Sequence, residues 1–291
     1  MIYIHAAGIH NSIPSGELPD LKIELKALSG KTYRRIDRFI QLALIGAHKA
    51  VAGYKLESDT ALYLTSGQGD IPVFERVRRQ RYFQKMMSKP VDFVNLASNT
   101  AGFYVSSHLG IAGANLFLGH HRFPVQMSLL LAQSDLELKR QSAILLGGVD
   151  EWLENQGLAK KLLGVSESVR LGEGSNWLLL KRTSAGALAS LQVDYRPFDL
   201  VQIKAEIGKL EPGTGLAFSR HLPATVVAEI MALRKDLRRF DYESDSAYYE
   251  TLPLYVLSKF LVSGFGKLIH IDSDGTGFMW LCLDRDGCLT V

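Results

Sequence analysis

GIAGANLFLGHHRFPVQM, residues 110–127, is the stretch that decides how this chain of 291 residues folds. Small and apolar residues repeat at helical spacing from Asn99 to His108, just before it, and two glycines end that pattern. The apolar run Leu116–Leu118 predicts a short strand, and Gly119–Pro124 predicts a sharp turn into a second helix. AILLGGVDE, residues 143–151, begins with a further apolar run that predicts a buried strand. The sequence here therefore predicts a strand, a turn and a helix beside a second buried strand.

Alternating strands and helices continue on both sides of this stretch. Before it, the sequence predicts a strand at Ile2–Ile4, an irregular segment at 11–30, a helix at Tyr33–Ala52, a strand at Ala61–Ser66 and a helix at Pro72–Met87. After it, helices are expected at Leu153–Leu163, Pro223–Arg238 and Leu252–Val262, and strands at Asn176–Lys181, Leu268–Ile271 and Phe278–Leu283. Such alternation indicates an α/β protein with a layered sheet.

The composition is that of an ordinary globular protein. Hydrophobic residues make up 47% of the chain and charged residues 22%, which is enough to bury a large core. The net charge of +3 is too small to indicate binding to nucleic acid or to an anionic membrane. Two basic clusters, Lys31–Arg38 and Arg76–Arg81, are interpreted as solvated helix faces. Docking of an acidic partner, such as an acyl carrier protein, is the alternative.

Cysteine usage and the chain start indicate the cellular compartment. Cys282 and Cys288 flank an Asp-Gly turn that predicts a terminal hairpin. Two cysteines in a chain of this length favour free thiols in a reducing compartment, and they are too few for a zinc site. The first residues, MIYIHAAGIHNS, lack the basic and apolar regions of a signal peptide, and no apolar run reaches membrane-spanning length. We therefore expect a cytoplasmic protein without a membrane span.

Four motifs follow one another as they do in one known enzyme family. They are RIDRF at 35–39, GIAGAN at 110–115, AILLGGVDE at 143–151 and LGEG at 171–174. Together they resemble the β-ketoacyl-ACP synthases, which have the thiolase-like fold. The resemblance implies α-β-α-β-α layers built from two pseudo-repeated halves of a single domain, residues 1–291. The N-terminal half would cover about 1–165, and a shortened C-terminal half about 166–291.

The family's nucleophile is missing from the predicted turn. When Gly113 is aligned with the glycine of the family's G-P-S segment, Arg122 falls where the acyl-accepting cysteine should be. An ion pair of Arg122 would then plug the pocket of the missing thiol. His120 and His121 stand beside it and could act as a general base or as metal ligands. Because adjacent side chains usually diverge, we interpret them as residues that shape the turn.

The family's catalytic histidines are also missing from their motifs. The family's P-H-G-T-G-T-like motif corresponds to PGTG at 212–215, which has no histidine. His221 and His270 remain in the C-terminal part, but neither has the family's surrounding residues. Condensation needs a thiolate, and decarboxylation needs positioned donors. The resemblance therefore implies no catalytic residue, no cofactor and no metal.

A ketosynthase-like chain without a nucleophile resembles the chain-length factors of type II polyketide systems. The resemblance is strongest to the compact subunit of bacterial aryl-polyene pathways. It implies pairing with an active ketosynthase, contact with an acyl carrier protein through that complex, and a tunnel that limits the growing acyl chain. The residues implied for the tunnel floor or the subunit interface are Phe93, Asn95, Leu96, Asn99, Thr100, Phe103 and Phe117.

Two other functions stay open from the sequence. The chain could be an autonomous acyltransferase or hydrolase that uses Ser98, Ser128 or the His120–His121 pair. It could instead bind nucleic acid through its basic clusters, in which case binding would depend steeply on salt. The small net charge argues against the second alternative.

Overall fold

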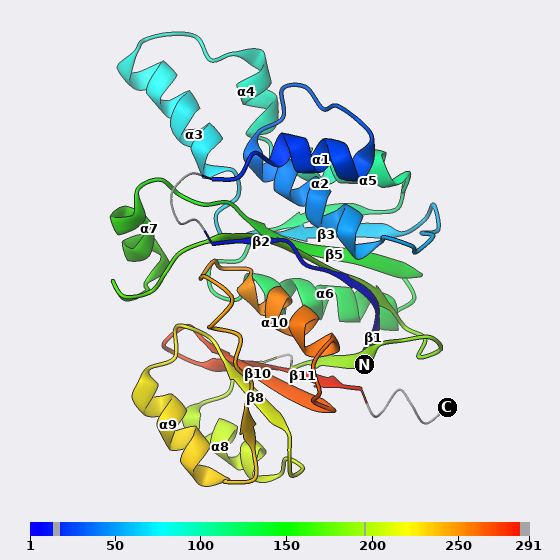
Figure 1. Cartoon of the computed structure of the whole chain (residues 1–291), viewed down its shortest axis with the longest axis vertical. Coiled ribbons are helices and arrows are strands. Elements are labelled where there is room, and N and C mark those ends of the chain that lie inside the picture. Colours follow the sequence, from blue (N-terminus) through cyan, green and yellow to red (C-terminus); the bar gives the residue numbers. More distant parts are fainter. Residues whose placement is uncertain (14–17, 195, 286–291) are drawn as a thin grey trace.

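The structure is a computed structural model that describes residues 1–13, 18–194 and 196–285. Its helices and strands form alternating layers (Figure 1). Helices α1 (Leu21–Ser29), α2 (Arg38–Ala50) and α5 (Thr100–Leu109) form one outer layer. Helices α6 (Pro124–Glu137) and α10 (Leu252–Leu261) lie in the middle, and α8 (Leu200–Gly208) and α9 (Ala224–Leu233) form the other outer layer. The α-β-α-β-α layering expected from the sequence is confirmed.

The strands form two pseudo-repeated halves. In sheet order they are β4-β3-β5-β6-β1-β7-β11-β10-β8-β9, with the short β2 (Asn11–Ser12) paired to β6. The first half contains β1 (Ile2–Gly8), β3 (Ala61–Thr65), β4 (Asn115–Leu118), β5 (Ala143–Asp150) and β6 (Glu173–Lys181). The second contains β7 (Ala189–Val193), β8 (Gly215–Phe218), β9 (Arg238–Arg239), β10 (Lys267–Ser273) and β11 (Phe278–Asp284).

Both halves use the same strand order and the same strand directions. In the first half β4, β3 and β5 are parallel neighbours, β6 pairs antiparallel with β5, and β1 pairs antiparallel with β6. In the second half β9, β8, β10, β11 and β7 repeat this arrangement in the same order. The two halves join where β1 pairs with β7. The strand order thus changes from one half to the other between β6 and β7.

The core lies on both faces of the first half's strands. Leu62 and Leu64 of β3 pack in the hydrophobic cluster of α2 and α5, whereas Ala61 and Tyr63 pack in that of α6 and α10. Because successive side chains of a strand point to opposite faces, this strand is apolar at nearly every position. A Cβ atom added at Gly147 would lie 2.3 Å from the Trp177 ring, so the glycine allows this side chain to pack against β5.

Two of the sequence motifs meet in a buried ion pair. Arg38, from RIDRF, donates hydrogen bonds of 2.8 and 2.5 Å to the two carboxylate oxygens of Glu173, from LGEG. Glu173 is fully buried at the start of β6. A bidentate guanidinium–carboxylate pair of this kind fixes the orientation of both side chains. It therefore ties the start of α2 to the sheet.

Several elements differ from the sequence-based expectation. Helix α1 forms inside the segment 11–30 that was expected to be irregular, because Asp20 caps its start and Gly30 ends it in the left-handed conformation. The helix expected at Pro72–Met87 is α3 (Ile71–Arg78) followed by a π-helix, η1 (Arg79–Phe83). Helix α9 ends at Leu233, and the residues after it form β9.

The second half also contains elements that were not expected. Helix α8 and strands β7 and β8 are too short, or too weakly patterned, to stand out from the sequence. The expected terminal hairpin with Cys288 lies outside the described residues, and Cys282 has a free thiol. Across the described part of the chain, no helix combines the length and the apolar character needed to cross a bilayer.

Candidate functional site

The strand–turn–helix unit forms as predicted, and we call it the elbow. It consists of β4, the turn 119–123 and the start of α6 at Pro124. The hydroxyl of Thr65, at the end of the neighbouring β3, donates to the carbonyl oxygens of Leu118 at 2.9 Å and Pro124 at 3.3 Å. These two bonds hold the strand and the helix of the elbow together from one side.

His120 caps the elbow with its own side chain. Its Nδ1 accepts hydrogen bonds from the backbone N–H groups of Arg122, at 3.2 Å, and Phe123, at 3.0 Å. Amides at a helix start are the groups that could stabilise an oxyanion in acyl transfer. Here they are already satisfied within the turn. His121 is exposed beside it, and the described residues contain no group of three or more side chains suited to holding a metal ion.

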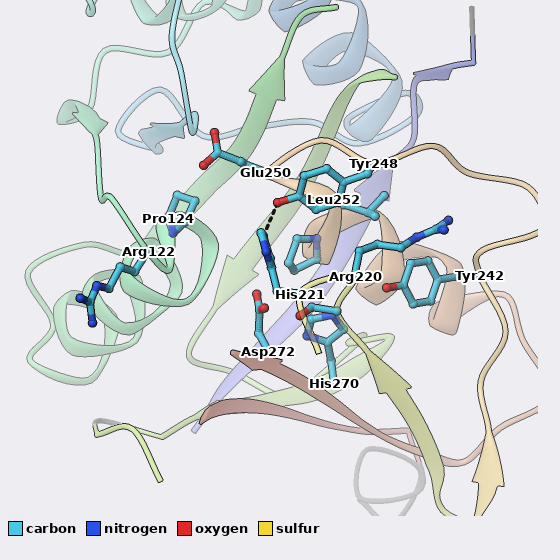
Figure 2. A pocket seen from close by; sticks show the side chains of 12 residues that line it. Arg122, Pro124, Arg220, His221, Tyr242, Tyr248, Glu250, Leu252, His270 and Asp272 are labelled. Carbon is cyan, nitrogen blue, oxygen red and sulfur yellow. Dashed lines mark hydrogen bonds between the residues drawn. The ribbon is translucent and has the colours of Figure 1, made fainter. Parts of the chain in front are cut away.

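Arg122 does not plug a buried pocket. Its side chain is 51% exposed and donates to Asp274 Oδ2 at 2.7 Å and to Thr276 Oγ1 at 2.9 Å. In Figure 2 the guanidinium group points away from His221. Burial alone would raise the pKa of Asp274, but hydrogen bonds from Thr276, Gly277 and Arg122 lower it to about 2. The expected ion pair therefore forms at the surface, where it links the elbow to the β10–β11 turn.

A small chamber lies behind the elbow, between the two halves of the fold. It is lined by Arg122, Pro124, Ser219, Arg220, His221, Tyr242, Tyr248, Glu250, Leu252, Pro253, His270 and Asp272, and we call it the elbow chamber (Figure 2). Its volume is about 20 Å³, which is space for about one water molecule. No acyl group can enter a space of this size.

The two histidines that lacked a recognisable motif meet in this chamber. His221 follows β8, and its Nε2 lies 2.5 Å from the hydroxyl of Tyr248. His270 lies within β10, where complete burial lowers its pKa, so it is neutral at pH 7. Both come from the second half of the chain, far in sequence from the elbow. The sequence contains both histidines, but it does not show that they lie close together.

Side chains of the segment between β9 and α10 fill the chamber. This segment occupies the place in the second half that the elbow turn occupies in the first, since β9 corresponds to β4 and α10 to α6. It contributes Tyr242 and Tyr248, whose pKa values are raised because the phenols are buried. Tyr242 also donates to the carbonyl oxygen of Phe218 at 2.5 Å. The apolar and aromatic run AYYETLPLY, residues 247–255, was the signal that could have predicted this closure.

A larger cavity lies on the other side of the elbow, at the carboxyl end of β3. This β3 cavity has a volume of about 380 Å³. It is lined by Phe39, Ile40, Ser66, Gly67, Gln68, Gly69, Asp70, Ile71, Phe74, Asn95, Leu96, Ala97, Ser98, Ala101, Phe117 and Gly119. Ligand pockets for small molecules commonly begin at about this size and combine apolar walls with a few polar groups.

The structure divides the seven residues expected for a tunnel or interface into three groups. Asn95, Leu96 and Phe117 line the β3 cavity. Phe93, on α4 (Pro90–Asn95), and Phe103, on α5, are 71% and 65% exposed and point away from the core. Thr100 and Asn99 lie at the start of α5 and do not line the cavity. The hydroxyl of Thr100 donates to the carbonyl oxygen of Val94 at 2.7 Å.

The two serines considered as nucleophiles lie in different surroundings. Ser128 is buried inside α6 and donates its hydroxyl to the carbonyl oxygen of Pro124 at 2.7 Å. Ser98 lines the β3 cavity, and no histidine is among the described residues around that cavity. Among the described residues, neither serine forms a hydrogen bond with a histidine that could activate its hydroxyl.

Carboxyl groups brace the turn 66–70 between the two spaces. Asp150 is buried and accepts hydrogen bonds from the Ser66 hydroxyl, the Gly67 amide and the Thr251 amide, at 2.7 to 2.9 Å. Burial raises the pKa of Asp70, on the β3 cavity, to about 6. Burial and then the charge of Asp150 raise the pKa of Glu250, on the elbow chamber, to about 7. One carboxyl with a raised pKa thus borders each space.

Glu151 is a fourth carboxyl residue in this region, beside Asp70, Asp150 and Glu250. Burial, followed by the charge and hydrogen bonding of Asp70, raises its pKa well above the ordinary value. The sequence motif GGVDE predicted the strand before Glu151 but not its place among buried carboxyls.

Comparison with known proteins identifies the fold. Neither a protein-family model nor a curated protein matches the sequence. Among solved structures, the ishigamide ketosynthase/chain length factor aligns over 98% of this chain and 99% of its own chain, with a TM-score of 0.72 and 14% identity. A type II polyketide synthase acyl-carrier protein in complex with its ketosynthase, AntDE:AntF, aligns over 98% and 99%, with a TM-score of 0.62 and 12% identity.

A third solved structure supports the same conclusion. The ketosynthase ApeO in complex with its chain length factor ApeC, from Xenorhabdus doucetiae, aligns over 98% of this chain and 99% of its own chain. The TM-score is 0.53 and the identity 13%. At such low identities the likeness establishes the fold, which is the fold of ketosynthases and chain length factors. The fold expected from the sequence motifs is thereby confirmed.

Proposed function

We propose that this chain is a non-catalytic chain-length factor that pairs with an active ketosynthase and shapes its acyl tunnel in polyketide biosynthesis, of the aryl-polyene kind. The state of the elbow carries the proposal. The elbow has no nucleophile, its helix-start amides are capped by His120, and the chamber behind it holds about 20 Å³. A chain of this fold with its reaction centre closed can still contribute shape.

The β3 cavity is the part that would receive the end of the acyl chain. Its walls are largely apolar, with Phe39, Ile40, Ile71 and Phe117 among them, and Leu96 lies at the α4–α5 junction. Extension would stop when the chain end meets these side chains, because protein interiors are close-packed and resist further insertion. Its volume of about 380 Å³ suits a chain end of limited length.

An exposed apolar surface beside this cavity supports pairing with a second subunit. Phe93 and Val94 on α4, Phe103 on α5 and Leu116 on β4 are all exposed, and β4 is an edge strand of the sheet. Apolar surface and unpaired strand edges are common features of protein interfaces. We call these four residues the apolar face. Burial of this face by a ketosynthase would bring the β3 cavity next to the partner's reaction centre.

The decisive experiment is co-expression with the ketosynthase encoded beside this chain. We expect a 1:1 complex by size-exclusion chromatography and light scattering, and products of defined length from that complex only. Formation of a covalent acyl intermediate on this chain alone, detected by intact-protein mass spectrometry, would contradict the proposal. It would instead favour an autonomous acyltransferase or hydrolase.

The tunnel assignment predicts the effect of a larger side chain in the β3 cavity. Leu96→Trp should shorten the product, because the indole occupies space that the chain end would otherwise fill. Leu162→Trp, on the exposed side of α7 (Gln156–Leu163), provides a control with the same change in side chain. Product length is read by mass spectrometry. Unchanged length in Leu96→Trp, with the complex intact, would move the end of the tunnel elsewhere.

A further inference from the structure

The π-helix η1 and the four residues after it form a segment, RQRYFQKMM at 79–87, that we call the tip. Every residue from Arg81 to Met87 is exposed. Four of them are large and aromatic or apolar, with exposed fractions between 58% and 84%: Tyr82, Phe83, Met86 and Met87. Single exposed apolar residues are common on protein surfaces, but a group of this density indicates an interaction surface.

The tip is a hydrogen-bonded turn at one end of the molecule. The backbone N–H of Gln84 donates to the carbonyl oxygen of Arg79 at 3.0 Å, and that of Met86 donates to Gln80 at 2.9 Å. Lys85 has a φ of 54°, in the left-handed region, and turns the chain back at this point. Helices α3 and α4, which the tip connects, project together beyond the outer helices in Figure 1. The exposed side chains are therefore presented on a folded projection.

Positive charge is concentrated in and around the tip. The segment 75–89 contains one acid, Glu75, and six basic residues: Arg76, Arg78, Arg79, Arg81, Lys85 and Lys89. Its net charge therefore exceeds the +3 of the whole chain, so the rest of the chain is slightly negative. The small net charge of the chain hides this local excess, and it does not argue against an anionic binding partner at the tip.

The inner cations fix the projection and the outer cations face solvent. Arg76 donates to Asp37 at 2.9 Å and to Asp92 at 3.0 Å, which ties the end of α3 to the starts of α2 and α4. Three cations of the tip are exposed and form no ion pair within the part of the chain that the structure describes: Arg79, Arg81 and Lys85. Unpaired cations and apolar side chains thus share one small surface.

We propose that the tip binds the surface of a membrane that contains anionic lipids. The negative potential of such a surface attracts cations that come within a Debye length of it. Aromatic and other apolar side chains can then enter the boundary between headgroups and acyl chains, while arginine and lysine keep their charges at the headgroups. The slightly negative remainder of the chain is not attracted, so the protein would approach the surface with its tip first.

Two features favour a lipid surface over a protein partner. No residue of the tip lines the elbow chamber or the β3 cavity, so neither hollow offers a partner's side chain a place beside the tip. The run from Arg81 to Met87 is also exposed at every position, whereas a protein partner usually covers one face of a segment. A fluid headgroup layer needs no groove and can surround a projection on all sides. This inference is independent of the proposed function and leaves the apolar face available for a ketosynthase.

The test uses the full chain and co-sedimentation with sucrose-loaded vesicles. Vesicles of equal parts phosphatidylglycerol and phosphatidylcholine are compared with vesicles of phosphatidylcholine alone, between about 50 and 300 mM salt. We expect binding to the anionic vesicles that weakens as the salt concentration rises. Binding to the neutral vesicles should be at least about tenfold weaker, because the electrostatic attraction is then missing.

Two variants separate the cations from the apolar side chains. Arg79→Gln/Arg81→Gln/Lys85→Gln should bind the anionic vesicles at least about tenfold more weakly. Tyr82→Ser/Phe83→Ser/Met86→Ser/Met87→Ser should bind about fivefold more weakly or less tightly still, and should keep its salt dependence. Lys22→Gln/Lys26→Gln/Lys31→Gln removes the same charge on and after the exposed side of α1 and should bind like the wild type. Circular dichroism checks that each variant is folded.

The proposal is overturned if the unmodified chain does not bind the anionic vesicles, or if the glutamine variant of the tip binds them as tightly as the wild type. Equal losses in the tip variant and the α1 control would show general attraction of a basic protein and would also overturn it. Wild-type binding by the serine variant would exclude entry of the apolar side chains. Loss of affinity for a soluble acidic protein in the glutamine variant, with vesicle binding unchanged, would assign the tip to a protein partner instead.

Discussion

The elbow chamber and the β3 cavity lie on either side of the same elbow, yet one is closed and the other open. The chamber has a volume of about 20 Å³ and is lined by buried tyrosines and histidines. The cavity has a volume of about 380 Å³ and mostly apolar walls. The turn 66–70 lies between them and is braced by Asp150. One side of the elbow thus has room for about one water molecule, and the other has the volume of a small-molecule pocket.

An active enzyme of this fold would need both a reaction centre and a binding space. A reaction centre needs an accessible nucleophile and free amide donors, and neither is found at this elbow. A binding space needs only volume and walls of suitable shape. If the chamber and the cavity are independent of each other, changes on one side of the elbow should leave the other side intact.

Opening the chamber should cost stability without creating activity. Tyr248→Ala removes a buried ring, so we expect a loss of about 3–5 kcal/mol in the free energy of unfolding. Tyr248→Phe should cost only about 1 kcal/mol, because it keeps the ring and removes the hydrogen bond to His221. Urea unfolding measures both. An acylated Tyr248→Ala chain would show that closure, rather than the missing thiol, keeps the elbow inactive.

The carboxyls that border the two spaces should make stability depend on pH. Asp70 and Glu250 have folded-state pKa values raised to about 6 and about 7, from 3.8 and 4.5. The folded chain therefore binds protons that the unfolded chain has released. This contribution is fully present below about pH 4 and is lost as the pH rises through about 6 and 7. We expect a fall of about 1–3 kcal/mol across this window.

Amide variants of the same residues provide the control for this pH dependence. Asp70→Asn keeps the helix cap to the Val73 amide, and Glu250→Gln keeps the side-chain shape. The double variant should show a clearly smaller fall in stability between about pH 4 and pH 8, and the slope that remains comes from Asp150, Glu151 and buried histidines such as His270. An unchanged slope in that variant would assign the pH dependence to other groups.

Removing the cap of the elbow should have the smallest effect. His120→Ala leaves the amides of Arg122 and Phe123 without their side-chain acceptor, which should cost about 0.5–1 kcal/mol. The exposed His121→Ala is the matched control, with an expected change near zero. Equal effects of the two substitutions on urea unfolding would argue against the capping role of His120.

The first half of the fold could be predicted from the sequence with few errors. The strands at Ala61–Thr65 and Ala143–Asp150 are continuous apolar runs, and α2 carries a regular apolar stripe, so local pattern is sufficient for them. The second half was harder, because β8 has four residues and β9 two. Such strands are specified by pairing with neighbours rather than by their own pattern. Helix α1 was missed because its capping residues lie among prolines and glycines.

The candidate site was predictable only in part. The absence of a cysteine or serine from the turn 119–123 follows from the sequence, and the structure contains that turn, whereas the assignment of Arg122 to a nucleophile position stays a prediction. The seven implied tunnel or interface residues fall into cavity-lining and exposed sets, which a linear pattern cannot distinguish. For example, Leu96 lines the cavity while Phe93, three positions earlier, is exposed. The direction of each side chain depends on where α4 meets α5.

The sequence by itself determined the layered α/β fold, the elbow and the absence of its nucleophile, since these depend on local pattern and on residue identity. The tertiary structure alone decided that His221, Tyr248 and His270 close the chamber and that the β3 cavity stays open. These side chains come from β8, the segment before α10, and β10. They meet only because β8 pairs with β10 and the segment before α10 packs against β8 within the second half, and no local pattern specifies contacts between segments so far apart.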